Sequence, residues 1–273
     1  MCTELEIKSA FFPFNLFLFS TEPQVIREAE QAGVDGFVVD WEYIGKAERQ
    51  RDADTQINRD TLEDLLRVRK STSKTVLCRI NAYHPSRIQE IEQAIEAGAD
   101  EIFLPMVRTV EEVAAVLERV KERCGVGILI ETVEAIELAE SFSKFPLSRV
   151  YVGLNDLSID RKTPSIFTAV LDGTVEFLRQ KFSVPFGFGG LTVPESGFPI
   201  PCRLLMGEMA RLGCQFSFLR RSFYRDLQGK TMAEMIFRIR EGLSRAFLRS
   251  AEEVEKDHLE LGKAIQRLEA KGK

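Results

Sequence analysis

Several residues and motifs that anchor common enzyme classes are scarce or absent in this chain of 273 residues. It has only two histidines, His84 and His258, and shows neither an HExxH motif nor a Ser/His/Asp order. No G-x-G-x-x-G motif follows an apolar run, so a dinucleotide site has no anchor. The predicted strand ends carry no lysine, which argues against Schiff-base chemistry. We interpret His84 as a loop residue that by position could also act as a general base, and His258 as structural.

The five cysteines contain no CxxC motif and no paired spacing, which is typical of reduced thiols in a cytoplasmic protein. The apolar run Ala10–Phe19 resembles a signal-peptide core, but Glu4 and Glu6 precede it and no small-residue cleavage site follows. That run is too short to cross a bilayer, and we interpret it as the first buried strand. The formal net charge of -5 argues against nucleic acid. We therefore expect neither a nucleic-acid nor a membrane partner.

Apolar runs alternate with amphipathic segments along most of the chain. This alternation predicts parallel strands joined by helical crossovers, and eight such units favour a closed (β/α)8 TIM barrel over an open doubly wound sheet. We expect one barrel domain over residues 1–250. Its predicted strands are Phe14–Phe19, Gly36–Trp41, Thr75–Asn81, Glu101–Val107, Gly127–Glu131, Val150–Leu154, Phe186–Gly190 and Phe216–Arg220. Its predicted helices are Pro23–Ala32, Arg59–Ser71, Ser86–Ala97, Thr109–Arg123, Val133–Ser143, Pro164–Lys181, Cys202–Leu212 and Ser222–Leu248.

An extra C-terminal helix is predicted within residues 251–273. It is highly charged and carries a narrow apolar seam at alternating spacings of four and three, formed by Val254, His258, Leu261, Ile265 and Leu268. The seam has two interpretations of equal weight: the helix lies on its own barrel, or it contacts another subunit. We expect a homo-oligomer in which this helix takes part.

Two carboxylates follow consecutive strands of the predicted barrel. Glu131 ends the run Gly127–Ile130, and Asp156 follows the run Val150–Leu154. The carboxyl ends of barrel strands form the face on which active sites are built. Two oxygen ligands at that face suit Mg²⁺ or Mn²⁺ and leave positions for water and substrate. The alternative is that each carboxylate only caps the helix behind it.

Arg79 lies near the end of the third strand, and Asn81, two residues on, points the same way, so we expect Asn81 to bind substrate beside Arg79. A buried guanidinium needs an anion, which is either a structural carboxylate such as Asp40 or Glu42, or a substrate carboxylate bound in bidentate fashion. Asp40 and Glu42 share one face at the end of the second strand. They could orient Arg79 or a metal-bound water, or only anchor the long polar loop Gly45–Asn58, which is too polar to be core.

The seventh strand ends in consecutive glycines. Gly189 and Gly190 let backbone N–H groups approach an anionic ligand, although a bulge at a tight corner explains them equally well. The proline-rich loop Leu191–Pro201 could cover the barrel mouth. Positive charge on this side comes from three arginines, among which the sequence does not choose: Arg203, Arg220 and Arg221.

At these residues the chain resembles the HpcH/HpaI aldolase and citrate lyase β-subunit-like family of phosphoenolpyruvate/pyruvate-type barrels. The likeness runs from about Gln24 to Leu219. Its most specific parts are Ile130-Glu131-Thr132 and Gly153–Ser158, supported by Ala97–Val113 and Cys78–Asn81.

The resemblance implies that Glu131 and Asp156 hold a divalent metal and that Arg79 binds a 2-oxo acid or stabilises its enolate. It implies a class II-type aldolase that cleaves or forms a hydroxy-2-oxo acid through a pyruvate-type enolate. Two alternatives remain: a lyase acting on an acyl thioester, as in citryl- or malyl-CoA-type cleavage, and a catalytically silent barrel that keeps the metal and ligand site.

The chain departs from the family pattern at the end of the second strand. The Asp-x-Glu-His of the HpaI-like branch, whose His assists proton transfer, is Asp40-Trp41-Glu42-Tyr43 in this sequence. The Gly-Pro of the Gly-Pro-x-Asp-Leu motif is Gly153-Leu154. The sequence therefore leaves the general base and the substrate open.

Overall fold

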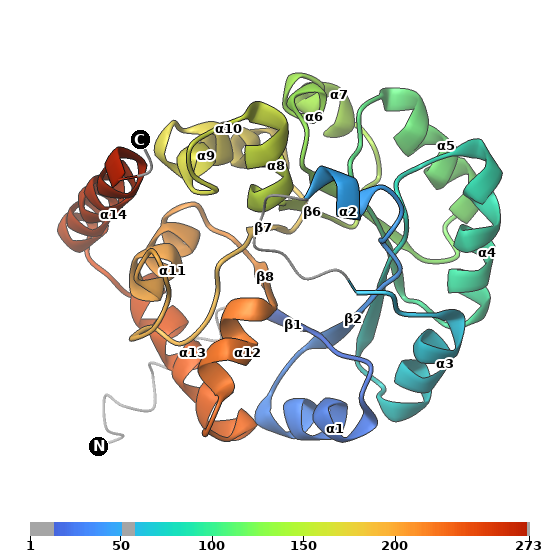
Figure 1. The fold of residues 1–273 in the computed structure, drawn as a ribbon, viewed down its shortest axis with the longest axis horizontal. Helices are drawn as coiled ribbons and strands as arrows, with labels where there is room; N and C mark the ends of the chain where they lie inside the picture. Colours follow the sequence, from blue (N-terminus) through green and yellow to red (C-terminus); the bar gives the residue numbers. More distant parts are fainter. Residues whose placement is uncertain (1–13, 51–57, 272–273) are drawn as a thin grey trace, which may run out of the picture.

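The computed structural model describes residues 14–50 and 58–271. Its strands form one parallel sheet in the order β7-β6-β5-β4-β3-β2-β1-β8, which curves into a nearly closed barrel surrounded by helices (Figure 1). The predicted TIM-barrel architecture is thus confirmed. The strands are β1 Asn15–Phe19, β2 Gly36–Asp40, β3 Thr75–Arg79, β4 Glu101–Leu104, β5 Gly125–Ile130, β6 Arg149–Val152, β7 Phe186–Phe188 and β8 Phe216–Leu219.

The barrel closes between β7 and β8 by a few hydrogen bonds. The backbone N–H of Gln215 donates to the carbonyl of Phe186 at 2.9 Å, and the Ser217 hydroxyl donates to the carbonyl of Phe188 at 2.8 Å. Elsewhere the register is that of regular parallel pairing, and it sets Asp40 of β2 beside Arg79 of β3. Because both residues end their strands, their side chains meet at the carboxyl-terminal mouth of the barrel.

Helices follow every strand. They are α1 Pro23–Ala32, α2 Lys46–Arg49, α3 Leu62–Ser71, the short 3₁₀ helix η1 Pro85–Arg87, α4 Ile88–Glu96, α5 Val110–Val120, α6 Val133–Glu137, α7 Ala139–Phe142, α8 Leu154–Arg161, α9 Thr168–Leu171, α10 Thr174–Lys181, α11 Cys202–Arg211, α12 Arg221–Leu227, α13 Met232–Phe247 and α14 Ala251–Lys271. Local sequence explains their ends: Thr61 and Thr109 begin α3 and α5 with capping boxes, and Gly33 ends α1 in the left-handed region.

Two short helices were not predicted. Strand β6 ends at Val152 instead of Leu154, and α8 begins at once, with Leu154 and Leu157 buried on one face. Asp156 therefore lies in the first turn of α8, two residues beyond the strand end predicted from the sequence. Helix α2 forms inside the predicted polar loop Gly45–Asn58, residues 51–57 of which lie outside the described chain.

The barrel interior is packed with aromatic side chains. Phe17, Phe103, Phe216 and Phe218 meet mostly edge to face, together with Phe19, Val38, Leu77, Leu129 and Tyr151. A Cβ on Gly127 would come within 2.3 Å of the Phe103 ring, so this glycine makes room for the aromatic packing. This apolar filling lies below the polar mouth, where the charged side chains gather.

Helix α14 lies on its own barrel, against α11 and α9. Its seam residues Leu261 and Ile265 are fully buried there, and His258 contacts Glu208 of α11 at 3.0 Å. The intramolecular interpretation of the seam is therefore the one observed, while the homo-oligomer stays a prediction.

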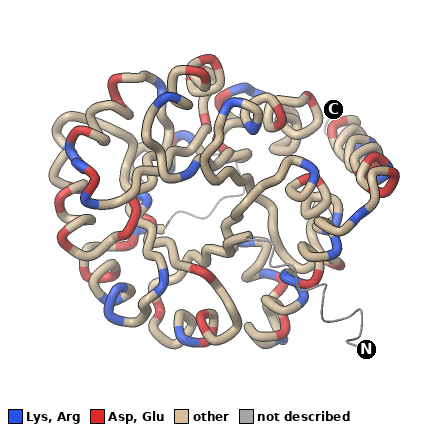
Figure 2. The backbone as a smooth tube through the Cα atoms, turned by 180° about the vertical axis from the view of Figure 1, so that it is seen from behind, with Lys and Arg blue, Asp and Glu red and all other residues tan. Residues whose placement is uncertain are grey.

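Seen from behind, charges of both signs alternate over the outer ring (Figure 2). Within residues 14–50 and 58–271, no helix combines the length and hydropathy that a membrane span requires.

Candidate active site

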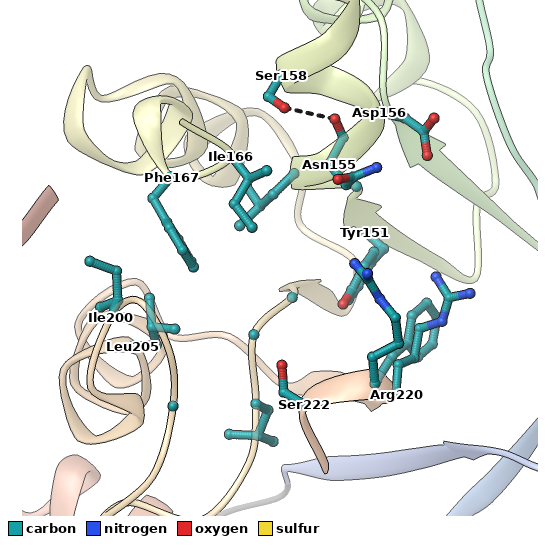
Figure 3. Close-up of a pocket in the computed structure, with 18 of the residues that line it drawn as sticks. Tyr151, Asn155, Asp156, Ser158, Ile166, Phe167, Ile200, Leu205, Arg220 and Ser222 are labelled. Carbon is teal, nitrogen blue, oxygen red and sulfur yellow. Dashed lines mark hydrogen bonds between the residues drawn. The ribbon is translucent and has the colours of Figure 1, made fainter. Parts of the chain in front are cut away.

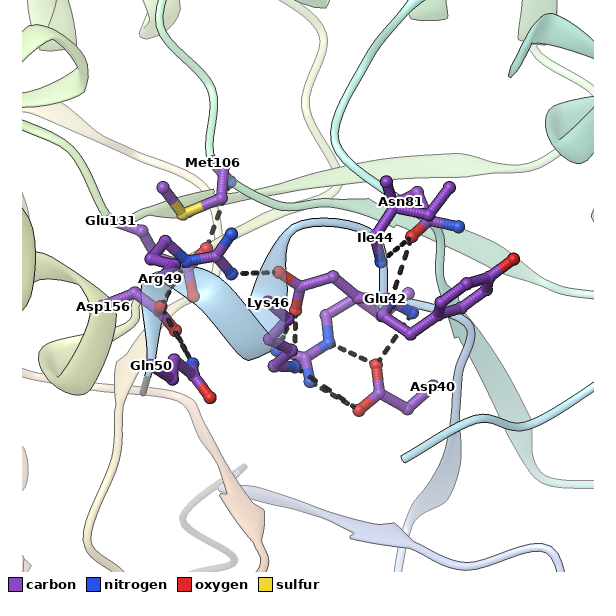
Figure 4. A network of polar contacts seen from close by, with 12 residues as sticks. Asp40, Glu42, Ile44, Lys46, Arg49, Gln50, Asn81, Met106, Glu131 and Asp156 are labelled. Carbon is purple, nitrogen blue, oxygen red and sulfur yellow. Dashed lines mark hydrogen bonds and ion pairs between the residues drawn. The ribbon is translucent and has the colours of Figure 1, made fainter. Parts of the chain in front are cut away.

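Charged side chains of both signs meet at the carboxyl-terminal mouth of the barrel (Figure 4). The acids come from β2 and from the segments that follow β2, β5 and β6. The bases come from β3, from α2 and from the end of β8. The acids are Asp40, Glu42, Glu131 and Asp156, and the bases are Lys46, Arg49, Arg79 and Arg220. The cluster thus brings together four acidic and four basic side chains.

Arg79 is held by two carboxylates. Its Nε and Nη2 donate to the two oxygens of Asp40 at 2.8 and 2.6 Å, and its Nη1 lies 3.2 Å from Glu42. Burial alone would raise the pKa of Asp40, but the charge and hydrogen bonds of Arg79 outweigh burial and bring that pKa to about 2. The structural pairing considered from the sequence is therefore present. These contacts do not use every N–H group of Arg79, which also lines the cavity described below.

Helix α2 brings two bases to Glu42. Lys46 donates to Glu42 at 2.7 Å, and Arg49 donates to its other oxygen at 2.7 Å. Lys46 is fully buried, and burial followed by repulsion from Arg79 lowers its pKa. The expectation that the Gly45–Asn58 segment is too polar to be core was wrong for Lys46 and Gln50, because buried acids compensate the cost of burying their polar groups.

Asp156 accepts hydrogen bonds from the end of the same helix. Arg49 Nε donates to one carboxylate oxygen at 2.7 Å, and Gln50 Nε2 lies 2.9 and 2.8 Å from the two oxygens. No side-chain hydrogen bond caps α8, whose N-cap residue is Gly153. Asp156 is therefore not the N-cap residue of α8, although it lies in the first turn, where a negative charge stabilises the helix N-terminus.

Glu131 is buried next to Asp156. One of its carboxylate oxygens accepts a hydrogen bond from the backbone N–H of Met106 at 3.1 Å, while Thr132 caps α6. Burial, then repulsion from Asp156, raises the pKa of Glu131 to about 8. Gly153 makes this approach possible, because a Cβ there would lie 2.3 Å from a Glu131 oxygen.

These residues fit a divalent cation. Two buried acids that repel one another are stabilised when a cation binds between them. Among the described residues no cluster of three or more His, Cys, Asp or Glu has metal-binding geometry. Two carboxylates match the way Mg²⁺ is bound in proteins, since this ion keeps several positions for water and substrate oxygens.

A cavity of about 480 Å³ is lined in part by Glu131 and Asp156. Figure 3 shows other residues around it. Ile166, Phe167, Ile200 and Leu205 form an apolar side, and Tyr151 and Arg220 lie across from them. Arg220 is 3.6 Å from Asp40 and 4.3 Å from the centre of the Phe19 ring, so its charge is less fully paired than that of Arg79. The cavity thus combines acidic, cationic and apolar walls.

Comparison with known proteins identifies the family of this chain. The HpcH/HpaI aldolase/citrate lyase family matches residues 14–175, which is more than half of the chain. The chain belongs to this family. It is a family of carbon–carbon lyases that typically use a divalent metal. No curated protein matches the sequence.

Two solved structures resemble this HpcH/HpaI family member in fold. The citrate synthase SbnG aligns with a TM-score of 0.56 and 16% identity, over 82% of this chain and 92% of that one. A citrate lyase from Burkholderia xenovorans LB400 aligns with a TM-score of 0.59 and 14% identity, over 95% of this chain and 85% of that one. Identities this low establish the barrel fold and no more.

The structure places the other residues predicted from the sequence in different surroundings. Gly189 and Gly190 line the cavity. Asn81 accepts the backbone N–H groups of Tyr43 and Ile44 at 3.1 and 3.0 Å and donates to Glu90, so its amide orders the segment after β2. His84 bonds Ser86 at the start of η1.

The sequence did not choose among three arginines, and the structure shows which of them lie at the cavity. Arg220 and Arg221 line the cavity, whereas Arg203 pairs with Asp257 and Glu260 of α14 on the outside of the barrel.

Sequence reasoning missed three side chains that enter the site, two from α2 and one from its C-cap residue Gln50. The available signal was Gly45 followed by KAERQ, a short helical segment with bases at positions three apart. Lys46 pairs with Glu42 four residues before it, whereas Arg49 and Gln50 reach Asp156 only through the fold, because Asp156 lies more than one hundred positions away along the chain.

Proposed function

We propose that this protein is a divalent-metal-dependent carbon–carbon lyase that cleaves or forms a hydroxy-2-oxo acid through a pyruvate-type enolate. Membership of the HpcH/HpaI family supports the lyase class. The observation that carries the finer assignment is the pair Glu131 and Asp156, buried together beside Arg79 at the mouth of the barrel. We further propose a cytoplasmic protein that acts as a homo-oligomer.

The metal ligands and Arg79 would act on the substrate in different ways. Mg²⁺ or Mn²⁺ held by Glu131 and Asp156 would polarise the 2-oxo acid and stabilise the negative charge of its enolate. Arg79 donates to the substrate carboxylate or to the enolate oxygen with the N–H groups that Asp40 and Glu42 leave unused.

Asp40 and Glu42 act as positioning residues, because both are hydrogen-bonded or paired to bases. Asn81, first predicted to bind substrate, is assigned to ordering the Tyr43–Ile44 backbone. Gly189 and Gly190, after the end of β7, line the cavity, so their backbone groups can approach a bound substrate closely.

The test is exchange of the pyruvate methyl protons in D₂O, followed by NMR with and without Mg²⁺ or Mn²⁺. We expect metal-dependent exchange in the wild-type protein and its loss in Glu131→Gln and Asp156→Asn. Glu134→Gln is the matched control, since Glu134 is about half exposed and pairs with Arg108 outside the cavity. Absence of metal-dependent exchange with every small 2-oxo acid would contradict the aldolase assignment. Exchange that survives in Glu131→Gln would contradict the metal-ligand assignment.

An acyl thioester lyase of the citryl- or malyl-CoA type is the second candidate. The supporting observation is that Arg220, Arg221 and Arg225 line the cavity together with its apolar side, which suits an acyl chain leading to a phosphorylated carrier. Cleavage of such thioesters without exchange of free pyruvate would favour this candidate.

A silent barrel is the third candidate. The family histidine is replaced by Tyr43, which is 47% exposed and does not line the cavity. Metal binding without exchange or cleavage of either substrate class would favour it.

A further inference from the structure

Asp156 is engaged by α2 in a way that the proposed metal site does not by itself require. Arg49 Nε and Gln50 Nε2 both donate to its Oδ1, at 2.7 and 2.9 Å, and Gln50 Nε2 also lies 2.8 Å from Oδ2. An ionised carboxylate oxygen accepts about two hydrogen bonds. The Oδ1 of Asp156 is therefore fully used before any cation arrives.

A positive charge beside Asp156 is also supplied by the protein itself. The Arg49 guanidinium lies between Asp156 and Glu42, with Nε on the first and Nη2 on the second at 2.7 Å each (Figure 4). A guanidinium on a buried carboxylate provides the positive charge that a metal would otherwise provide. Arg49 and a divalent cation are thus alternatives at Asp156.

Gln50 supplies independent evidence that this arrangement is incompletely satisfied. Its side chain is 5% exposed, and its Oε1 is the one buried side-chain polar atom without a hydrogen-bond partner in the described chain. A buried acceptor left unpaired lowers the stability of the arrangement that contains it. The bond from Gln50 to Asp156 is therefore one that a stronger ligand of Asp156 can replace.

We propose that Arg49 and Gln50 form an internal clamp on Asp156, which a divalent metal must displace in order to bind. The clamp makes α2 a determinant of metal affinity. Glu42 remains bonded to Lys46 and to Arg49 Nη2, so α2 stays attached to the barrel when Asp156 is released. This inference rests on the proposed metal site at Glu131 and Asp156.

The first test is calorimetric or EPR titration of the full-length protein with Mn²⁺. We expect Gln50→Ala and Arg49→Gln each to bind Mn²⁺ about tenfold more tightly than wild type, because each removes a competing bond to a charged group. Glu48→Gln, an exposed position on the same helix, is the control and should bind as wild type.

Gln50→Ala is the decisive variant, because it changes no charge. If only Arg49→Gln tightened binding, the effect would be one of overall charge and the clamp would be refuted. Wild-type or weaker affinity in both variants would refute it as well. Circular dichroism checks that the variants are folded.

The second test needs no variant. Hydrogen–deuterium exchange of the wild-type protein should show faster exchange at the amides of Arg49 and Gln50 when Mn²⁺ is added, since α2 loses its contacts with Asp156. Unchanged or slower exchange there would overturn the clamp.

Failure of the clamp and failure of the metal site give different results. If Glu131→Gln and Asp156→Asn leave Mn²⁺ binding intact, the proposed metal site fails, and the clamp fails with it. If these substitutions abolish binding while Gln50→Ala does not tighten it, only the clamp fails.

Discussion

Glu131 is a carboxyl group whose protonation depends on its surroundings more than on its own chemistry. Burial removes the water that would solvate its charge, and Asp156 adds repulsion, so its pKa rises from 4.5 to about 8. At neutral pH the metal-free protein therefore holds Glu131 mainly as the neutral acid. A cation bound at this position must displace that proton.

This gives a pH-dependent prediction for Mn²⁺ affinity. Below about pH 8 the proton on Glu131 competes with the cation, so affinity should rise about tenfold per pH unit and level off above that pH. Calorimetry in buffers of different ionisation enthalpy should show about one proton released per ion at pH 7. Affinity independent of pH between 6 and 8 would contradict the raised pKa.

The pKa of Asp40 shifts in the opposite direction, and the cation beside it is Arg79, a side chain of the protein itself. Its pKa is lowered from 3.8 to about 2, so the stability gained from Arg79 is fully present above pH 4 and is lost as pH falls through 2.

We expect Asp40→Asn to reduce the free energy of unfolding by about 3 to 5 kcal/mol, because it leaves Arg79 buried beside a neutral amide. Chemical denaturation at pH 7 measures the loss. Glu134→Gln, at the exposed pair with Arg108, should change stability by less than about 1 kcal/mol. A loss in Asp40→Asn no larger than in this control would refute the role assigned to the pair.

At the scale of elements, the turn from β6 into α8 positions the second acid. The strand stops at Val152, Gly153 passes close to Glu131, and the first turn of α8 presents Asp156. Two acids from successive βα units come together because the intervening residue has no side chain.

Gly153→Ala should therefore weaken Mn²⁺ binding by about tenfold or more, because its Cβ would meet a Glu131 oxygen at 2.3 Å and displace that carboxylate. The φ of Gly153 is -83°, so alanine fits the backbone and the effect is not one of backbone strain. Gly262→Ala in α14 is the control, since its Cβ would have only an ordinary 3.7 Å contact with Leu171. Equal Mn²⁺ affinity in both variants would contradict this account.

Prediction of the elements from sequence succeeded where periodicity is strong. Helix α1 matches its predicted limits, Pro23–Ala32, because an amphipathic pattern and Gly33 define it locally. Three predicted helices are each two shorter ones: the segments Val133–Ser143, Pro164–Lys181 and Ser222–Leu248 break near Leu138, Gly173 and Gly229. Helix α2 was not predicted, because its buried polar side chains are stabilised by Glu42, just before the helix, and by Asp156 on the distant helix α8.

At the scale of the whole molecule, α14 completes the core of its own barrel. Leu261 is 1% exposed against neighbouring helices, whereas Leu259 on the same helix is 52% exposed. Leu261→Ala should lower the free energy of unfolding by about 2 to 5 kcal/mol, measured by denaturant titration. Leu259→Ala should have little effect, and similar losses in both variants would contradict this packing.

The proposed homo-oligomer is tested separately by light scattering. Because the buried side of α14 is occupied within the chain, we expect Leu261→Ala to lower stability without changing the molecular mass of the folded protein. A mass equal to one chain for the wild type would refute the oligomer.

The sequence by itself determined the barrel and the chain positions of its acids. Strand and helix periodicity are local properties, and a parallel barrel brings every strand end to one face, so Glu131, Asp156, Arg79 and Asp40 could be assigned together. Only the tertiary structure decided how these charges pair. Burial and the distances between groups far apart in sequence are set by the fold. Burial, then repulsion from Asp156, raises the pKa of Glu131, and the fold also brings Arg49 to Asp156.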